Sequence, residues 1–389
     1  MGITKKNIAV IFGTRPDTIK LAPVIQELQR YEKFFSLCQI TTAQHREMLD
    51  DVLSVFSMKP QYDLNVMGLR QSLSTLAQHI LEKLDYVLAM ENPDLVIVQG
   101  DTATTFVSSL AAFHRKIPIA HVEAGLRTMD KMLPFPEETY RRLTSHVADL
   151  HFTPTPTATK ALIKEGIPKQ SIICTGNTVI DALQRTVRPN YEFSSKHAKE
   201  VLAQNKRFVV VTTHRRENLG EPMLRICEAL REVAVRHPET NFVFPVHLNP
   251  AVRDTVYTIL KDIANVMLME PLNYSDFINL LACSYAVITD SGGLQEEAPA
   301  LGKPVLVMRD VTERPEAVRY GTVKLIGTEK ESIITNTHTL LSNTKVYRSM
   351  ATAVNPYGDG KASERIVATL MNRYGYSKQK VKGFVPKAP

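Results

Sequence analysis

The chain of 389 residues lacks any run of about eighteen apolar residues, so no membrane span is expected. Its four cysteines are widely scattered and include no C-x-x-C pair, which argues against a metal site or a disulfide framework and fits a reducing cytoplasm. The apolar run after Lys5 and Lys6 is short and has no small-residue cleavage site. It therefore predicts a first strand rather than a signal peptide.

Positive charge is concentrated at the two ends of the chain. The formal net charge is +7, of which four lysines in the last stretch, GYSKQKVKGFVPKAP, contribute +4 and Lys5 and Lys6 contribute +2. The body of the protein is therefore near neutral, and no basic stripe with interleaved aromatic residues occurs. Nucleic acid is not an expected partner.

Short apolar runs rich in β-branched residues alternate with longer helical patterns. Continuous rather than alternating apolar runs predict strands buried on both faces, and hence parallel sheets covered by helices. The runs occupy residues 7–12, 36–41, 95–99, 117–122, 149–153 and 172–176 in the first half, and 207–213, 241–246, 265–269, 285–289, 304–308 and 322–326 in the second. A polar stretch, RTVRPNYEFSSKH, separates the halves, which predicts two doubly wound α/β domains in tandem.

Ligands of open parallel sheets bind beyond the carboxyl ends of the strands, so polar motifs that directly follow a strand are the candidates. GTRPDTIK follows the first strand and places Arg15 and Lys20 near a helix N-terminus, although a plain strand–turn–helix with surface cations has the same pattern. It matches neither G-x-G-x-x-G nor a Walker A loop, and no nicotinamide fingerprint follows the other strands.

Three acids follow later strands of the first half. Asp101 (in QGDTATT) suits an N-cap, Glu123 lies in HVEAGLRT, and Glu137 (in PFPEETYRR) suits a first helical turn with Arg141 four residues on. Each has a purely structural explanation by itself. Together they fall at one edge of one sheet, where clustered carboxylates shift one another's pKa values and can act as acid and base.

The second half offers cations and a glycine turn at its strand ends. THRRENLG contributes His214 and Arg215, and FPVHLNP contributes His247. In DSGGLQEEA, the Ser291–Gly293 turn can present backbone N–H groups to a diphosphate, and Glu297 can accept hydrogen bonds from a ribose diol. These features predict a nucleoside diphosphate ligand.

Eight segments taken together resemble the non-hydrolysing UDP-N-acetylglucosamine 2-epimerases. They run in order from about residue 7 to about residue 327: GTRPDTIKLAPVI, TAQHREMLD, QGDTATT, HVEAGLRT, PFPEE, THRRENLG, FPVHLNP and TDSGGLQEEAPALGKPVLVMRDVTERPEAV. The resemblance implies a GT-B fold, two Rossmann-like domains with the active site in the cleft between them, and a homodimer. It implies reversible epimerisation of UDP-GlcNAc to UDP-ManNAc without a cofactor or metal, by elimination of UDP to a 2-acetamidoglucal and its re-addition, which supplies ManNAc for surface glycans.

The resemblance also assigns roles to residues. It implies catalytic roles for Asp101, Glu123, Glu137 and His214. Its substrate-binding positions are Arg15, Lys20, Arg141, Ser291, Gly292, Gly293, Glu297 and Arg314. A second, regulatory UDP-GlcNAc site would comprise Gln44, His45, Arg70, Arg215 and His247.

This chain departs from the family pattern at several positions. Asp17 and Thr18 replace Glu-Ala, Glu47 replaces Gln, Gln99 replaces His, and Tyr140 replaces Asn. Three alternatives therefore stay open: an epimerase of a modified UDP-sugar such as a diacetamido sugar, or a hydrolysing form; a GT-B glycosyltransferase; and a non-catalytic nucleotide-sugar sensor.

The expected domains follow from the same resemblance. Residues 1–185 form the first Rossmann-like domain and 186–362 the UDP-binding domain. A C-terminal helix at about 363–377 is expected to cross back to the first domain, and the basic tail 378–389 is expected to be disordered.

Overall fold

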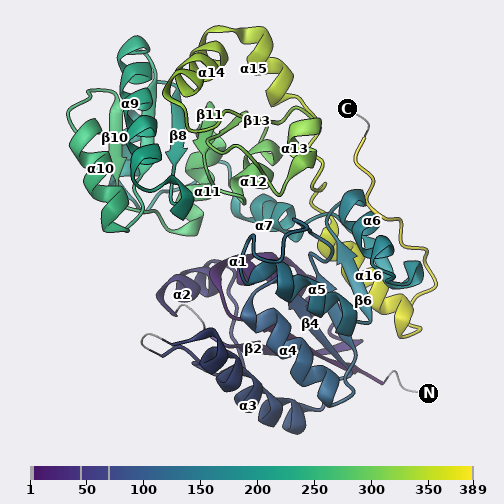
Figure 1. Ribbon diagram of the computed structural model, residues 1–389. Helices are drawn as coiled ribbons and strands as arrows, with labels where there is room; N and C mark the ends of the chain where they lie inside the picture. The colour runs from purple at the N-terminus through teal and green to yellow at the C-terminus, as the bar shows by residue number, and fades with distance from the viewer. Residues whose placement is uncertain (1–3, 44–45, 69–70, 388–389) are drawn as a thin grey trace. The chain divides into compact units, whose positions relative to one another are not determined.

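The computed structural model describes residues 4–43, 46–68 and 71–387 (Figure 1). It divides into two compact units. The N-terminal unit comprises Met1–Gln184 together with Tyr357–Val385, and the C-terminal unit comprises Arg185–Pro356 together with Pro386–Pro389. The first boundary lies one residue before the expected one, and the chain rejoins the N-terminal unit at Tyr357, six residues before the expected helix.

Within the described residues, the N-terminal unit holds a seven-stranded parallel sheet in the order β3-β2-β1-β4-β5-β6-β7. Its strands are β1 (Lys6–Phe12), β2 (Phe35–Thr41), β3 (Tyr62–Asp63), β4 (Leu95–Gln99), β5 (Ile119–Val122), β6 (Leu150–Thr153) and β7 (Ile172–Cys174). Side chains of the central strands are buried on both faces, as the continuous apolar runs predict. The two-residue β3 at the sheet edge was not predicted, because it is too short to carry a periodic signal.

Helices cover this sheet. They are α1 (Arg15–Arg30), α2 (Arg46–Val55), α3 (Leu73–Glu91), α4 (Ala103–His114), α5 (Glu137–Val147), α6 (Pro156–Lys164), α7 (Thr178–Thr186) and α16 (Ala362–Arg373), with a 3₁₀ turn η1 (Lys169–Ser171). Several begin at a hydroxyl cap; the Thr102 hydroxyl, for example, accepts a hydrogen bond from the Thr105 amide at 3.2 Å and starts α4 directly after β4. α16 packs against α1 although more than 300 residues separate them (Figure 1).

The C-terminal unit repeats the plan, again within the described residues, with a six-stranded parallel sheet in the order β10-β9-β8-β11-β12-β13. Its strands are β8 (Phe208–Thr212), β9 (Asn241–Pro245), β10 (Val266–Met269), β11 (Ala286–Thr289), β12 (Val305–Val307) and β13 (Val323–Leu325). Its helices are α8 (Lys196–Ala203), α9 (Glu221–Arg236), α10 (Pro250–Leu260), α11 (Tyr274–Cys283), α12 (Leu294–Ala300), α13 (Pro315–Arg319), α14 (Lys330–Ser342) and α15 (Thr344–Ala351), with a 3₁₀ turn η2 (Arg216–Asn218). The predicted fold class, two doubly wound parallel-sheet domains, is confirmed.

The basic tail differs from the expectation of disorder. Residues 378–387 are described, and residues 378–385 belong to the N-terminal unit (Figure 1). The Phe384 amide donates to the Cys174 carbonyl at 2.7 Å, and the Phe384 side chain is buried. The lysine-rich composition predicted disorder, but one buried aromatic residue and its backbone hydrogen bond order the segment.

No helix in the described part of the chain has the length and apolar character needed to span a membrane.

Candidate functional site

Each sheet reverses its strand order at one point, and the polar motifs follow the strands that flank this point or, for Glu123 and His247, the next strand along the sheet. In the N-terminal unit this switch point lies between β1 and β4, and in the C-terminal unit it lies between β8 and β11. Loops beyond the carboxyl ends of such strands form the ligand sites of doubly wound sheets. The candidate residues therefore fall at the expected edge of each unit.

Glu123, directly after β5, is the most heavily coordinated of the candidate acids. Lys20 donates to both of its carboxylate oxygens at 2.5 and 2.7 Å, Gln99 donates to Oε2 at 2.5 Å, and Asn177 donates to Oε1 at 2.8 Å. Glu123 is buried and has a left-handed backbone with φ of 62°. Strained conformations of this kind persist where the surrounding structure holds them, which is common at functional sites. The three donors favour the ionised carboxylate.

Asp101, at the carboxyl end of β4, forms an ion pair with Arg141 of α5. Arg141 is buried and also contacts Glu138 at 3.3 Å, and Glu138 is fully buried. Glu138 also pairs with Arg142 at 2.9 Å and accepts from the Thr128 amide at 3.0 Å. Arg141 thus joins α5 to the end of β4. It is placed to position Asp101.

Glu137 begins α5 and differs from the other two acids. Its Oε2 atom is buried and has no hydrogen-bond partner among the described residues. The structure thus pairs Lys20 with Glu123 and Arg141 with Asp101, and Glu137 lies on the same helix as Arg141.

The turn after β1 is held by Asp17. Its carboxylate accepts hydrogen bonds from the Gly13 amide at 3.1 Å and from the Thr14 amide and hydroxyl, both at 2.7 Å. Burial raises the pKa of Asp17 to about 6, although the Thr14 and Gly13 hydrogen bonds oppose the rise. A side chain at Gly13 would meet the Thr42 hydroxyl, so only glycine fits this turn. The turn begins the helix that carries Arg15 and Lys20.

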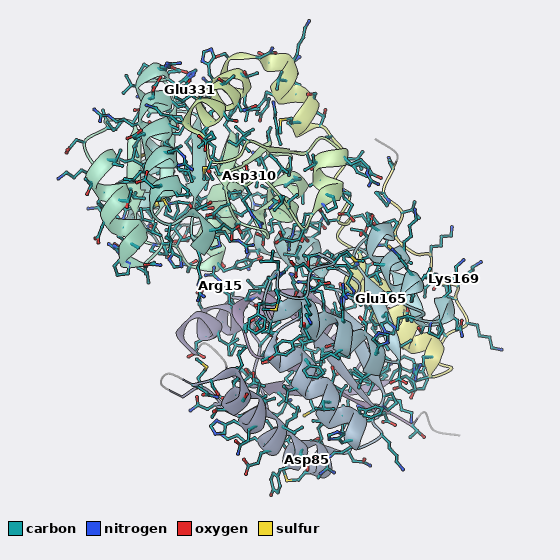
Figure 2. All side chains as sticks on the ribbon, in the orientation of Figure 1. Arg15, Asp85, Glu165, Lys169, Asp310 and Glu331 are labelled. Carbon is teal, nitrogen blue, oxygen red and sulfur yellow. The ribbon has the colours of Figure 1, made fainter. Side chains whose placement is uncertain are left out.

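Two other charged groups after β5 are accounted for by structure. His121 is fully buried, its Nε2 lies 2.7 Å from the Gly100 carbonyl, and burial lowers its pKa to about 3, which keeps it neutral. Arg127 makes a two-pronged ion pair with Glu165, at 2.8 and 2.7 Å, at the end of α6 (Figure 2 labels Glu165). Both side chains maintain the loop that carries Glu123.

In the C-terminal unit, the fully buried Asp290 after β11 organises the loop after β8. Its carboxylate accepts hydrogen bonds from the Thr213 hydroxyl at 2.7 Å, from the His214 and Arg215 amides at 3.0 and 2.9 Å, and from the Asn218 amide group at 3.0 Å. The His214 ring stacks on the His247 ring, with centroids 5.9 Å apart. Burial lowers the pKa of His214, although Asp290 opposes the shift.

Arginines surround the glycine turn of the same unit. Arg314 donates to Glu296 at 2.6 Å and to Glu313 at 2.8 Å, and Glu313 also contacts Arg309 at 2.9 Å and Arg215 at 3.4 Å. Burial alone would raise the pKa of Glu313, but Arg314 and Arg309 bring it to about 2. The family resemblance implies a substrate-binding role for Arg314. In the structure, its hydrogen bond to Glu296 joins the start of α13 to α12.

The remaining predicted residues divide into two groups. Ser291, Gly292 and Gly293 form the turn before α12, and Glu297 lies half-buried in the first turn of that helix. Of the regulatory site, Arg215 and His247 belong to the loops after β8 and β9. Gln44, His45 and Arg70 lie outside the described residues, as does the side chain of Glu47.

Sequence reasoning missed four residues that shape the site: Asn177, Asp290 and Glu313, and Gln99, which was noted only as a departure. Asp290 directly follows β11, in the TDSGG segment, and Asn177 lies in the CTGNT segment between β7 and α7. These positions after strands were the available signal. Asn177 lies 54 residues from Glu123, and Asp290 lies 77 residues from Thr213, and no local pattern reveals contacts across such separations.

Comparison with known proteins agrees with this architecture. The family model of UDP-N-acetylglucosamine 2-epimerase matches residues 26–371. The UDP-N-acetylglucosamine 2-epimerase of Bacillus subtilis strain 168 is 48% identical over 383 residues, which cover 98% of this chain and 100% of the relative.

Solved structures are similar over the same extent. The UDP-GlcNAc 2-epimerase of Neisseria meningitidis bound to UDP-GlcNAc has a TM-score of 0.86 and 47% identity, covering 94% of this chain and 100% of that one. The S. aureus MnaA–UDP co-structure has a TM-score of 0.90 and 45% identity, covering 98% of this chain and 100% of that one. The chain belongs to the UDP-N-acetylglucosamine 2-epimerase family, a family of isomerases.

Proposed function

We propose that the protein interconverts UDP-GlcNAc and UDP-ManNAc by reversible, non-hydrolysing epimerisation at C2. The observation that carries this proposal is the buried Glu123 carboxylate, held by Lys20, Gln99 and Asn177 at a ligand-binding sheet edge. A preorganised carboxylate that stays ionised is what removal of a weakly acidic C2 proton requires.

The reaction balances as an elimination followed by an addition. A carboxylate removes the C2 proton, the C2–H electron pair forms the C1=C2 double bond, and UDP leaves from C1 with its bonding pair, giving 2-acetamidoglucal. UDP then adds back to C1, and a proton is delivered to the opposite face of C2. Asp101, Glu123 and Glu137 are the acid and base groups for these transfers.

The different surroundings of the three acids suggest which of them acts as acid and which as base. Asp101 forms an ion pair with Arg141, and Glu123 forms one with Lys20. The Oε2 atom of Glu137 is buried and has no hydrogen-bond partner among the described residues, so it is available to a bound sugar. We assign Glu137 as the proton carrier and Glu123 as a base.

The C-terminal unit holds the nucleotide in this proposal. The Ser291–Gly293 turn and His214 bind the diphosphate, Arg314 contributes positive charge to the leaving group, and Glu297 binds the ribose. The arginines that meet at Glu313 support this assignment, because their guanidinium groups can donate hydrogen bonds to phosphate oxygens. We place a regulatory UDP-GlcNAc site at Arg215 and His247, which His214 joins by ring stacking.

A modified UDP-sugar is the second candidate substrate. Tyr140 stands where the family pattern has Asn, and its ring stacks on Phe106 with centroids 5.4 Å apart, beside Glu137 in α5. A larger ring at this position changes the space beside the acids. The product formed from each sugar distinguishes the two candidates.

We propose a homodimer formed through α3 and α4. Tyr86 and Met90, one helical turn apart on α3, are 67% and 51% exposed, and Phe113 on α4 is 57% exposed. The two helices lie side by side (Figure 1), joined by an ion pair between Arg115 and Asp85, which Figure 2 labels. Large apolar side chains exposed on neighbouring helices are candidates for a protein interface. UDP-ManNAc formed in the cytoplasm would supply surface glycan synthesis.

Proton NMR of UDP-GlcNAc incubated with the protein in heavy water tests the proposal. UDP-ManNAc carrying deuterium at C2 is the expected product. An intact, unexchanged nucleotide sugar would refute simple epimerisation of UDP-GlcNAc, and a sugar transferred only when an acceptor is added would point to a glycosyltransferase.

A further inference from the structure

We propose that the C-terminal tail, residues 378–387, positions the catalytic carboxylate Glu123 by holding Asn177 in place. This inference rests on the proposed function, in which Glu123 works at C2 of the sugar. In this proposal, Phe384 is the tail residue that packs on the loop carrying Asn177, and it does not contact the substrate. The tail is thus a positioning element for the reaction.

The first link joins Asn177 to Glu123. The Asn177 side chain is buried and donates from Nδ2 to Glu123 Oε1 at 2.8 Å. Its Oδ1 atom accepts from the Val179 amide at 3.1 Å, which turns the Nδ2 group toward the carboxylate. The orientation of this amide therefore depends on the backbone of the loop that carries it.

The second link joins that loop, residues 174–177 between β7 and α7, to the returning C-terminal segment. The Asn177 amide donates to the Tyr357 carbonyl at 2.6 Å, and Arg365 of α16 donates to the Thr175 carbonyl at 3.0 Å. Gly176 has φ of 84°, a conformation that favours glycine and that external contacts must hold. Residues nearly two hundred positions away in the chain thus fix this loop.

The third link is Phe384. Its amide donates to the Cys174 carbonyl at 2.7 Å, and a Cβ atom at Gly176 would lie 3.5 Å from the Phe384 ring. The Arg365 guanidinium lies over the same ring, 5.7 Å from its centre, and donates to the Lys382 carbonyl at 3.3 Å. Phe384 therefore packs on the loop from outside, directly before Asn177.

The composition of the tail concentrates this role in one side chain. Among the described tail residues, Phe384 is buried, whereas its neighbour Val385 is 78% exposed and the four lysines are exposed. Removing the Phe384 ring leaves a void beside Gly176, and the loop can then shift by the few tenths of an ångström that weaken a hydrogen bond. Glu123 would lose one donor while Lys20 and Gln99 remain.

The test compares full-length Phe384→Ala with the matched control Val385→Ala. Two quantities are measured: deuterium exchange at C2 of UDP-GlcNAc as a function of pH, and UDP binding by calorimetry. Phe384→Ala is expected to lower kcat for exchange roughly tenfold, with the UDP Kd unchanged. The acidic limb of its pH profile should move to higher pH, because the charged carboxylate has lost a donor. Val385→Ala should match the unmodified protein.

The route through Asn177 is tested by combining variants. In an Asn177→Ala background, Phe384→Ala should lower exchange less than twofold further, because the link is already broken. An undiminished tenfold effect in that background would overturn the proposal. So would an equal effect of Val385→Ala, or exchange by Phe384→Ala that equals the unmodified protein. If Phe384→Ala does not fold, Phe384→Leu replaces it with the same expectations.

Failure of the proposed function gives a different pattern. The unmodified protein would then bind UDP but exchange no C2 proton. The link is in that case measured by urea unfolding of the unmodified protein, the two single variants and the double variant. The loss of unfolding free energy in the double variant should be smaller than the sum of the losses in Phe384→Ala and Asn177→Ala. A loss equal to that sum would overturn the link.

Discussion

Lys20 donates to both carboxylate oxygens of Glu123, at 2.5 and 2.7 Å, across 103 residues of the chain. The two side chains are 15% and 6% exposed, so the pair is almost fully removed from water. In such surroundings, removing one partner leaves an uncompensated charge.

Lys20→Met should therefore lower the free energy of unfolding by about 3 kcal/mol, measured by urea denaturation. Adding Glu123→Gln should recover part of this loss. Lys6→Met is the matched control, because its ion pair with Asp94 is about one-third exposed on each side and should cost under about 1 kcal/mol. Equal losses for Lys20→Met and Lys6→Met would contradict the buried-pair argument.

Arg141→Lys should lower the rate of C2 exchange roughly 10- to 100-fold. One ammonium cannot reach both Asp101 and Glu138 as the guanidinium does, and a misplaced catalytic group is costly. Arg142→Lys is the control, because the Arg142 side chain is 35% exposed and its ion pair is with Glu138, not with Asp101. The heavy-water NMR assay measures both, and an equal, small loss would remove Arg141 from a positioning role.

Gly292→Ala should destabilise the protein, whereas Gly293→Ala should not. A Cβ at Gly292 would lie 2.7 Å from Arg314 Nη1 and 3.0 Å from Glu313 Oε1, and Glu296 and Glu313 hold Arg314 in place. We expect a loss of about 1–3 kcal/mol. At Gly293 the backbone is helical and the nearest atom lies 3.6 Å away, so alanine should be neutral or stabilise by about 0.5 kcal/mol. Thermal and urea unfolding check both, and the reverse order would disprove the packing argument.

Asp17 should make stability depend on pH. Its folded-state pKa of about 6 exceeds the ordinary value of 3.8, so its contribution is greatest below pH 3.8 and is lost as pH rises through 6. The unfolding free energy of the unmodified protein, relative to Asp17→Asn, should fall by up to about 3 kcal/mol between pH 4 and pH 7. A difference that grows with pH would mean that the hydrogen bonds from Gly13 and Thr14 outweigh burial.

The strands could be located from the sequence because strands buried on both faces of a parallel sheet have short, continuous apolar sequences. Eleven of the twelve predicted runs start within one residue of the observed strand, and the run at 117–122 starts two residues early. Strand β3 was not predicted at all. Its two residues pair with β2 but have no local sequence pattern. Its pairing with β2 depends on the neighbouring strand rather than on its own residues.

Only part of the candidate site could be predicted from the sequence. Asp101, Glu123 and Glu137 could be found because each follows a strand, but Glu123's donors come from helix α1, the end of β4 and the loop after β7. Asp290 was read as part of a turn, whereas it holds the separate loop that carries His214. Contacts between distant segments have no signature in any one of them.

The sequence by itself determined the two-unit parallel architecture and the strand ends at which polar chemistry collects, because apolar periodicity and turn residues act locally. Tertiary structure alone decided which donor meets which acid and whether the lysine-rich tail is ordered. A single buried ring, Phe384, outweighs the polar composition around it, because the burial of that ring depends on a surface that other parts of the chain build.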